Sequence, residues 1–219
     1  MRNCLRFISY LFVLFTASWA SAGSYDDFFT AIKRNDDRTV ESLLKRGFDP
    51  NARDPQGFHG LFLAVKEPSP KVAVVLIDWP KTDVEPRTAQ DESPLMIASL
   101  NGDLELVQRL VNRGAHVNKT GWTPLHYAAT NGHLPVIRFL LEKSAYIDAE
   151  APSGTTPLMM AAHYGTPQAV KLLLDEGADP MLKNLQGLTA IDFANRANRK
   201  ESADLIAAFI RSRQPRGKW

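Results

Sequence analysis

The sequence predicts an all-α solenoid of about six helix-turn-helix units joined by short β-turn fingers. Three observations predict it: side-chain patterns recur at intervals close to 33 residues, a hydroxyl residue and a proline open several of the repeated segments, and glycines follow the apolar helical stretches. A fixed period of about 20 to 50 residues is typical of arrays in which each unit buries one face against the next.

The repeat is clearest in the second half of the chain, where four segments align that begin "ESPLMIAS", "GWTPLHYA", "GTTPLMMA" and "GLTAIDFA". Their anchor residues are 30, 33 and 33 positions apart, and steps of 34 and 33 towards the N-terminus reach two more anchors, which gives Phe28, Leu61, Leu95, Leu125, Leu158 and Ile191. We therefore expect one repeat domain over residues 23–211, with units near 24–53, 54–86, 87–118, 119–149, 150–182 and 183–211.

Each unit carries signals for two helices. Thr123 and Thr156 precede a proline, and a hydroxyl N-cap followed by proline at the first helical position starts a helix. The pair Ala128 and Ala129 keeps one face of that helix flat enough for the next unit to stack closely. The second helix has apolar residues at helical spacing and ends at a glycine such as Gly114, which suits a left-handed C-cap.

The segment "TPLHYAATNGHLPVIRFLLEKSA", residues 123–145, resembles an ankyrin repeat, whose T-P-L-H-x-A pattern and period it shares. The resemblance covers nearly the whole chain after residue 22. It implies a concave groove, formed by the fingers and the exposed faces of the first helices, that binds partner proteins. Two departures stand out. Residues 54–86 lack both the inter-helix glycine and the cap glycine, and Ser144 stands where glycine is expected, at a cost in backbone strain.

Residues 1–22 have the features of a cleaved secretory signal peptide: the basic residues Arg2 and Arg6, an apolar run, and an A-x-A site that places the cut after Ala22. A retained N-terminal anchor is the alternative. Cleavage would remove two of the 26 basic residues, none of the 24 acidic ones, and the only cysteine, Cys4. We therefore expect a periplasmic or secreted protein without disulfides, with no nucleic-acid partner and no stable membrane insertion.

The histidines make "GWTPLHYAATNGH" look catalytic. Catalysis by His126 would need a nucleophile beside it, and zinc binding would need further ligands that converge on one point. In the other units the position of His126 is held by Phe62, Met96, Met159 and Asp192. This tolerance of apolar residues indicates a packing position, so we expect His126 to make a structural hydrogen bond to Thr123. We predict no catalytic residue, no cofactor and no metal site.

The register places two rows of side chains along the predicted groove. The first row contains Phe58, Glu92, Trp122, Thr155 and Leu188, and the second contains Lys66, Leu100, Thr130, His163 and Arg196, with Asn101, Asn131 and Tyr164 beside it. Aromatic residues and arginine are typical interface anchors. We therefore predict partner contacts at Phe58, Leu100, Trp122, His163, Tyr164, Leu188 and Arg196.

Alternatives remain open for these surfaces. Phe58 and Trp122 could instead pack on neighbouring fingers. A third row, which is more typical of a core than of a surface stripe, contains Leu63, Ile97, Tyr127, Met160 and Phe193. The finger "HVNKTGW" is three residues shorter than its neighbours, so we expect the groove to be open beside Trp122.

The sequence as a whole predicts a monomeric, non-enzymatic protein–protein interaction module, exported to a bacterial periplasm, that binds an unidentified protein partner. Residues 212–219 are expected to form a basic flexible tail. One alternative function is an inhibitor or immunity protein of a periplasmic toxin or enzyme. Another, which rests on knowledge of the family alone, is a helper of catalase or oxidative-stress defence.

Overall fold

The computed structural model describes residues 23–67 and 69–213, and these residues confirm the predicted all-α class. Within this part of the chain, extended pairing is limited to one isolated β-bridge between Arg53 and His59. The chain divides into two compact units, Met1–Asp83 and Val84–Trp219, here called the N-terminal unit and the C-terminal unit. The predicted signal peptide, residues 1–22, lies outside the described residues.

The N-terminal unit contains a helical stretch over residues 23–33, followed by α2 (Asp37–Lys45), α3 (Gly60–Lys66) and α4 (Pro70–Asp78). Its core consists of large apolar side chains that are at most 2% exposed: Phe28, Ile32, Leu43, Leu61, Phe62, Leu76 and Ile77. Each such side chain contributes about 2 kcal/mol when it leaves water.

The connection between α3 and α4 lacks the turn glycine found in other repeats. Helix α3 ends at Glu67 in an extended conformation, and α4 begins after Ser69, whose hydroxyl donates to the carbonyl of Ile32 at 2.6 Å. Helix α4 ends at Trp79, also in an extended conformation. The departures seen in the sequence of residues 54–86 therefore change the local backbone at both ends of α4.

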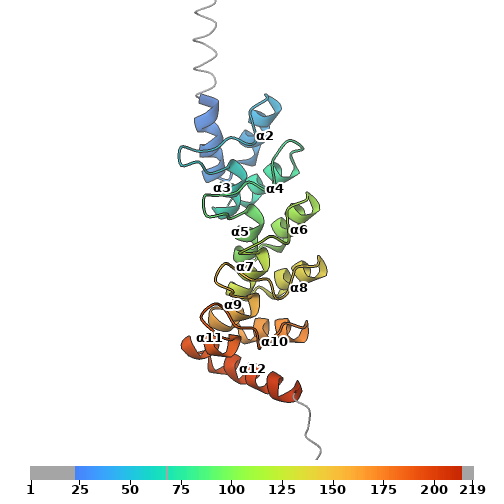
Figure 1. The fold of residues 1–219 in the computed structure, drawn as a ribbon. Helices are drawn as coiled ribbons and strands as arrows, with labels where there is room; N and C mark the ends of the chain where they lie inside the picture. Colours follow the sequence, from blue (N-terminus) through green and yellow to red (C-terminus); the bar gives the residue numbers. More distant parts are fainter. Residues whose placement is uncertain (1–22, 68, 214–219) are drawn as a thin grey trace, which may run out of the picture. The chain divides into compact units, whose positions relative to one another are not determined.

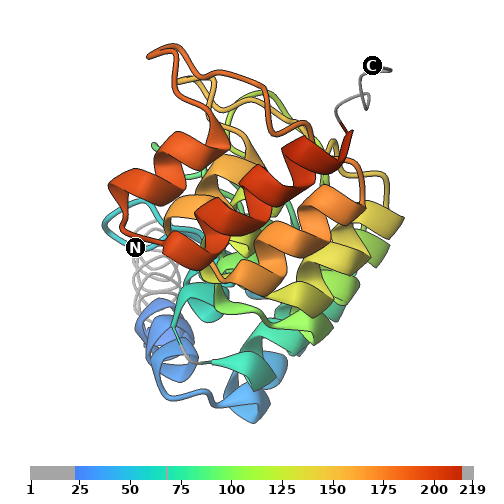
Figure 2. The same ribbon diagram turned by 90° about the horizontal axis from the view of Figure 1, so that it is seen from below.

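The C-terminal unit contains α5 (Pro94–Asn101), α6 (Leu104–Asn112), α7 (Pro124–Asn131), α8 (Leu134–Glu142), α9 (Pro157–His163), α10 (Pro167–Asp175), α11 (Ala190–Arg196) and α12 (Lys200–Arg213). The first helices α5, α7, α9 and α11 contact one another in succession, and the second helices α6, α8, α10 and α12 form a parallel layer (Figures 1 and 2). Helix α12 includes Ser212 and Arg213 of the predicted tail, and residues 214–219 lie outside the described residues.

Hydroxyl residues occupy the N-caps of the first helices of the C-terminal unit, as the sequence predicts for Thr123 and Thr156. The Ser93 side chain accepts from the amide of Met96 at 3.3 Å, and the Thr156 side chain accepts from the amide of Met159 at 3.4 Å. Proline occupies the first turn in α5, α7 and α9, where its missing N–H leaves no bond unmade.

Close stacking of the first helices depends on small residues. Ala128, Ala129, Ala161 and Ala162 are almost fully buried between α7 and its neighbours. A Cβ on Gly165, just after α9, would lie 2.5 Å from the carbonyl oxygen of Ala129 and 2.9 Å from that of Ala161. Only glycine therefore fits this approach of two backbones.

Ser144 stands where glycine is expected, and its backbone stays in the left-handed region. Gly114 and Gly177 end their repeats with φ of 93° and 105°, and Ser144 takes the same left-handed region with φ of 62°. An L-residue pays about 1 kcal/mol for this conformation. The predicted strain at Ser144 is thus confirmed.

The third row of the C-terminal unit is only partly core. Ile97 is 7% exposed, whereas Tyr127, Met160 and Phe193 are half-buried. These three side chains therefore contribute to the surface of the first helices as well as to their packing. Among the described helices, none combines the length and apolar character that spanning a membrane requires.

Candidate binding surface

Side-chain hydrogen bonds tie successive fingers together. Asn118 accepts from the amide of Tyr146 at 2.8 Å and donates to the carbonyl of Ser144 at 2.7 Å, and Asp148 accepts from the amide of Asp179 at 3.1 Å. These bonds link residues 26 to 31 positions apart. The fingers of the C-terminal unit therefore present a preorganised surface, which lowers the entropic cost of binding.

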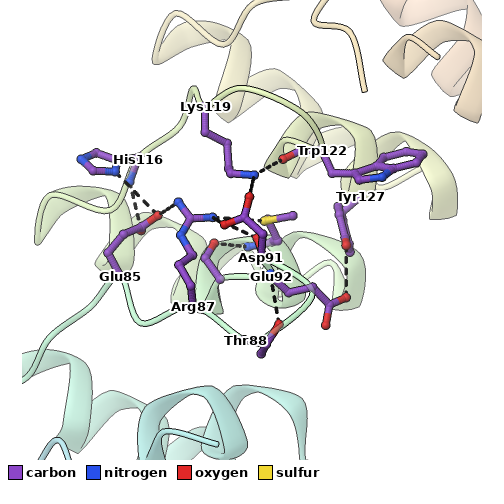
Figure 3. Close-up of polar contacts among 11 residues, drawn as sticks. Glu85, Arg87, Thr88, Asp91, Glu92, His116, Lys119, Trp122 and Tyr127 are labelled. Atoms are coloured by element: carbon purple, nitrogen blue, oxygen red, sulfur yellow. Dashed lines mark hydrogen bonds and ion pairs between the residues drawn. The ribbon is translucent and has the colours of Figure 1, made fainter. Parts of the chain in front are cut away.

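A charged network joins the fingers of the third and fourth repeats (Figure 3). Lys119 donates to the carboxylate of Asp91 and also, at 3.3 Å, to the carbonyl of Trp122. Arg87 pairs with Glu85 and lies 3.8 Å from the carboxylate of Asp91. The Lys119 ammonium beside Asp91 holds the pKa of this carboxyl below its usual value.

Asp91 occupies an unusual backbone position for this ion pair. Its φ is 62°, and glycines hold the left-handed position of the other fingers: Gly57, Gly121, Gly154 and Gly187. A non-glycine residue in this region carries strain. Asp91 thus places a carboxylate at a position where the other fingers have no side chain, and this carboxylate binds Lys119 at a cost in backbone strain.

A hollow of about 430 Å³ lies at these fingers. Its lining includes Asp91, Lys119, Gly121, Trp122, Glu150 and Pro152. This finger hollow is located at the short finger, where the sequence predicts an open groove beside Trp122. It combines an aromatic side chain, two carboxylates and one ammonium group.

Trp122 packs within its own repeat. Its half-buried ring meets His126 edge-to-face, with centroids 5.2 Å apart. The ring also lies on the same side of the repeat as Tyr127, whose hydroxyl donates to Glu92 at 3.1 Å (Figure 3). Trp122 therefore packs on a residue of its own repeat and not on a neighbouring finger. This contact fixes the ring, and part of the ring stays accessible to a partner.

His126 is a structural residue. Its Nδ1 accepts from the Thr123 amide at 3.2 Å and lies 2.9 Å from the Thr123 hydroxyl, and its Nε2 lies 2.9 Å from the carbonyl of Thr155. The predicted bond to Thr123 is thus confirmed. The imidazole is fully buried, and burial lowers its pKa to about 4. Both ring nitrogens are occupied and no substrate can reach them.

A second aromatic cluster lies where α9 meets α11. His163 contacts Tyr164 with centroids 4.2 Å apart and Phe193 with centroids 5.9 Å apart, and its Nδ1 lies 3.2 Å from the carbonyl of Phe193. Tyr164 is 55% exposed, and its carbonyl accepts from Arg199 at 3.0 Å. Arg196, at the end of α11, is also exposed. The structure therefore brings together two of the predicted contact residues, His163 and Tyr164, and leaves Arg196 on the exposed surface of α11.

The other predicted contact residues are less prominent. In the N-terminal unit, half-buried Phe58 stacks on Phe62 and lies beneath the Lys66 ammonium. In the C-terminal unit, Leu100 is half-buried, and Leu188 is half-buried in a finger closed by hydrogen bonds to Asn184. These positions remain predictions.

Some prominent surface features were missed from the sequence. Leu185 and Met181 are 81% and 58% exposed on the last finger. The ion pair between Asp91 and Lys119 was also missed, although the position of each residue beside a turn is visible in the sequence. Within the described residues, no group of three or more His, Cys, Asp or Glu side chains is placed to hold a metal ion.

The stacked helix pairs and preorganised fingers define a class of helical repeat proteins that bind through a surface and not through an enclosed site. Models of ankyrin repeats match residues 28–120, 61–152 and 142–194. The chain belongs to the ankyrin repeat family, which makes it a protein–protein interaction module.

Relatives identified by sequence are much longer proteins. The NF-kappa-B p105 subunit of Mus musculus is 31% identical over 153 residues, which cover 67% of this chain and 16% of that protein. Ankyrin repeat and SAM domain-containing protein 6 of Rattus norvegicus is 35% identical over 148 residues, which cover 66% of this chain and 12% of that protein. The chain therefore spans less than a fifth of either relative.

One solved structure is similar to most of this chain. It belongs to the complex of the predatory endopeptidase Bd0816 from Bdellovibrio bacteriovorus with the immunity protein Bd3460. The TM-score is 0.72 with 28% sequence identity, and the likeness covers 83% of this chain and 97% of the matched chain.

Proposed function

We propose that this chain is an exported, non-enzymatic inhibitor that binds an endopeptidase in the manner of an immunity protein. The observation that carries this proposal is the likeness to a chain from an endopeptidase–immunity protein complex, which covers 97% of that chain. The longer relatives share only a segment with this chain, so they say less about its function as a whole.

The surface of the C-terminal unit supports the proposal. An inhibitor needs a rigid face with a few well-placed anchors, because ordering flexible groups costs affinity. The fingers are tied to one another, and Trp122, Tyr164 and Leu185 offer part of their apolar surface to solvent. Inhibition would follow from covering the peptidase and would require no chemistry from this chain.

Export is part of the same proposal. The features of residues 1–22 support transfer to the periplasm, where an immunity-type protein would meet its peptidase before the peptidase attacks the cell. Fractionation of the host and mass spectrometry of the mature chain test this step. A periplasmic protein that begins at Gly23 is expected. A full-length protein in the cytoplasm would contradict it.

Affinity capture tests the binding step. The purified chain is immobilised and exposed to a periplasmic extract of the host, and captured proteins are identified and assayed for endopeptidase activity. We expect an endopeptidase that is captured in stoichiometric amount and inactive while bound. Capture of non-peptidases alone, with full peptidase activity left in the extract containing excess chain, would refute the proposal.

A further inference from the structure

The finger hollow has an excess of negative charge. Asp91 lies in its wall but is already paired with Lys119. Glu150, which lines the hollow from the next finger along the chain, is exposed, and no ion pair to it is found among the described residues. Among the charged residues that line the hollow, the two carboxylates of Asp91 and Glu150 face one ammonium, that of Lys119.

Lys119 does not turn the hollow into an anion site. Its side chain is only 13% exposed, and its ammonium is held by the carboxylate of Asp91 and the carbonyl of Trp122. The groups left to meet an incoming side chain are therefore the Glu150 carboxylate, the exposed part of Asp91 and the ring of Trp122.

We infer that the finger hollow receives an arginine side chain of the partner protein. A guanidinium group is planar and can donate two parallel hydrogen bonds to one carboxylate while it stacks on an aromatic face. Glu150 supplies the carboxylate and Trp122 the ring, and the apolar wall at Pro152 suits the methylene stem of the arginine. A lysine ammonium would meet the same charge but would lack the bidentate bond and the planar stacking.

This inference rests on the proposed function, because it identifies one contact of the inhibitory surface. It is tested without the partner. N-acetyl-arginine methylamide is titrated into the full chain, and the indole N–H resonance of Trp122 is followed by NMR and assigned with Trp122→Phe. N-acetyl-citrulline methylamide is the matched neutral probe, and N-acetyl-lysine methylamide is the cationic one.

The arginine probe is expected to shift the Trp122 resonance saturably in the millimolar range, the lysine probe more weakly, and the citrulline probe not at all. Glu150→Gln should weaken the arginine probe about threefold, the range of a partly exposed ion pair. Glu142→Gln, an exposed glutamate on α8, is the matched control and should leave binding unchanged.

Equal shifts from arginine and citrulline, or an unchanged affinity in Glu150→Gln, would overturn the inference. If inorganic phosphate shifts the Trp122 resonance and the arginine probe does not, the hollow binds anions through Lys119 and the inference is wrong. The outcomes also separate the two proposals. If the chain binds the arginine probe but forms no complex with an endopeptidase, the inhibitor proposal fails and the arginine site stands. If the endopeptidase complex forms equally well with Glu150→Lys, the arginine site fails and the inhibitor proposal stands.

Discussion

Replacing His126 with methionine should flatten the dependence of the unfolding free energy on pH. Burial holds the pKa of His126 at about 4, against 6.5 for an unperturbed histidine. The unfolded chain therefore binds the proton more tightly than the folded one. The stabilising contribution of the neutral ring is complete above pH 6.5 and is lost as pH falls from 6.5 towards 4.

The size of this effect follows from the two pKa values. One pKa unit corresponds to about 1.4 kcal/mol, so the full loss below pH 4 is about 3 kcal/mol. Between pH 7 and pH 5 the unfolding free energy should fall by about 2 kcal/mol through His126 alone. Burial also lowers the pKa of His59 to about 4, but His59 is present in both proteins and cancels in the comparison.

Methionine is the chosen replacement because the same position holds Met159 in the next repeat, where its sulfur accepts from the amide of Thr156 at 3.4 Å. His126→Met loses the bond to the Thr155 carbonyl, which still accepts from the amide of Ala151 at 2.9 Å. The cost at pH 7 should therefore be about 1 kcal/mol.

Urea unfolding followed by far-ultraviolet circular dichroism at pH 7 and pH 5 gives the measurement. The difference between the two pH values should be about 2 kcal/mol smaller in His126→Met than in the wild type. Met159→His should act in the opposite direction and steepen the dependence. Identical pH dependence in the wild type and His126→Met would refute the assignment of His126 as a buried, neutral, structural residue.

Three further predictions concern the repeats and their surface. Ser144→Gly should raise the unfolding free energy by about 0.5–1 kcal/mol in urea titrations because it relieves a left-handed backbone, and a loss of stability would contradict this. Gly165→Ala should lower it by about 2 kcal/mol or more, since its Cβ would lie 2.5 Å from a carbonyl oxygen of α7; an unchanged midpoint would show that α7 and α9 separate freely. Trp122→Ala and Tyr164→Ala, made as separate variants, should each weaken endopeptidase capture at least tenfold with folding retained. The control is Tyr146→Ala, which changes a tyrosine outside the predicted rows that is 67% exposed, and it should leave capture unchanged. Equal capture by all three variants would place the interface elsewhere.

The local features of the fold could be predicted because each depends on residues close in sequence. Thr156 and Pro157 define a helix start within one turn, and a cap position such as Ser144 is identified by counting from the repeat anchor. The bond between His126 and Thr123 spans three residues and follows from the same register. Periodicity of the chain was therefore sufficient for most helix starts and caps, but it did not predict the extended ends of α3 and α4 or the continuation of α12 to Arg213.

The candidate site was less predictable because its contacts join separate fingers. Asp91 and Lys119 are 28 positions apart, and their pairing depends on the direction of two side chains across a turn. Glu150 belongs to a third finger and enters the hollow only through the stacking of repeats. No spacing rule identifies these partners, whereas single aromatic residues such as Trp122 could be found by composition and register.

Calorimetric titration of the chain into a purified periplasmic endopeptidase of its host, with peptidase activity measured on the same mixtures, shows whether this chain is an endopeptidase inhibitor. We expect one chain bound per peptidase, with activity lost in proportion to the bound fraction and restored when the complex dissociates. Absence of binding heat across the periplasmic endopeptidases, with activity unchanged in excess chain, would contradict it.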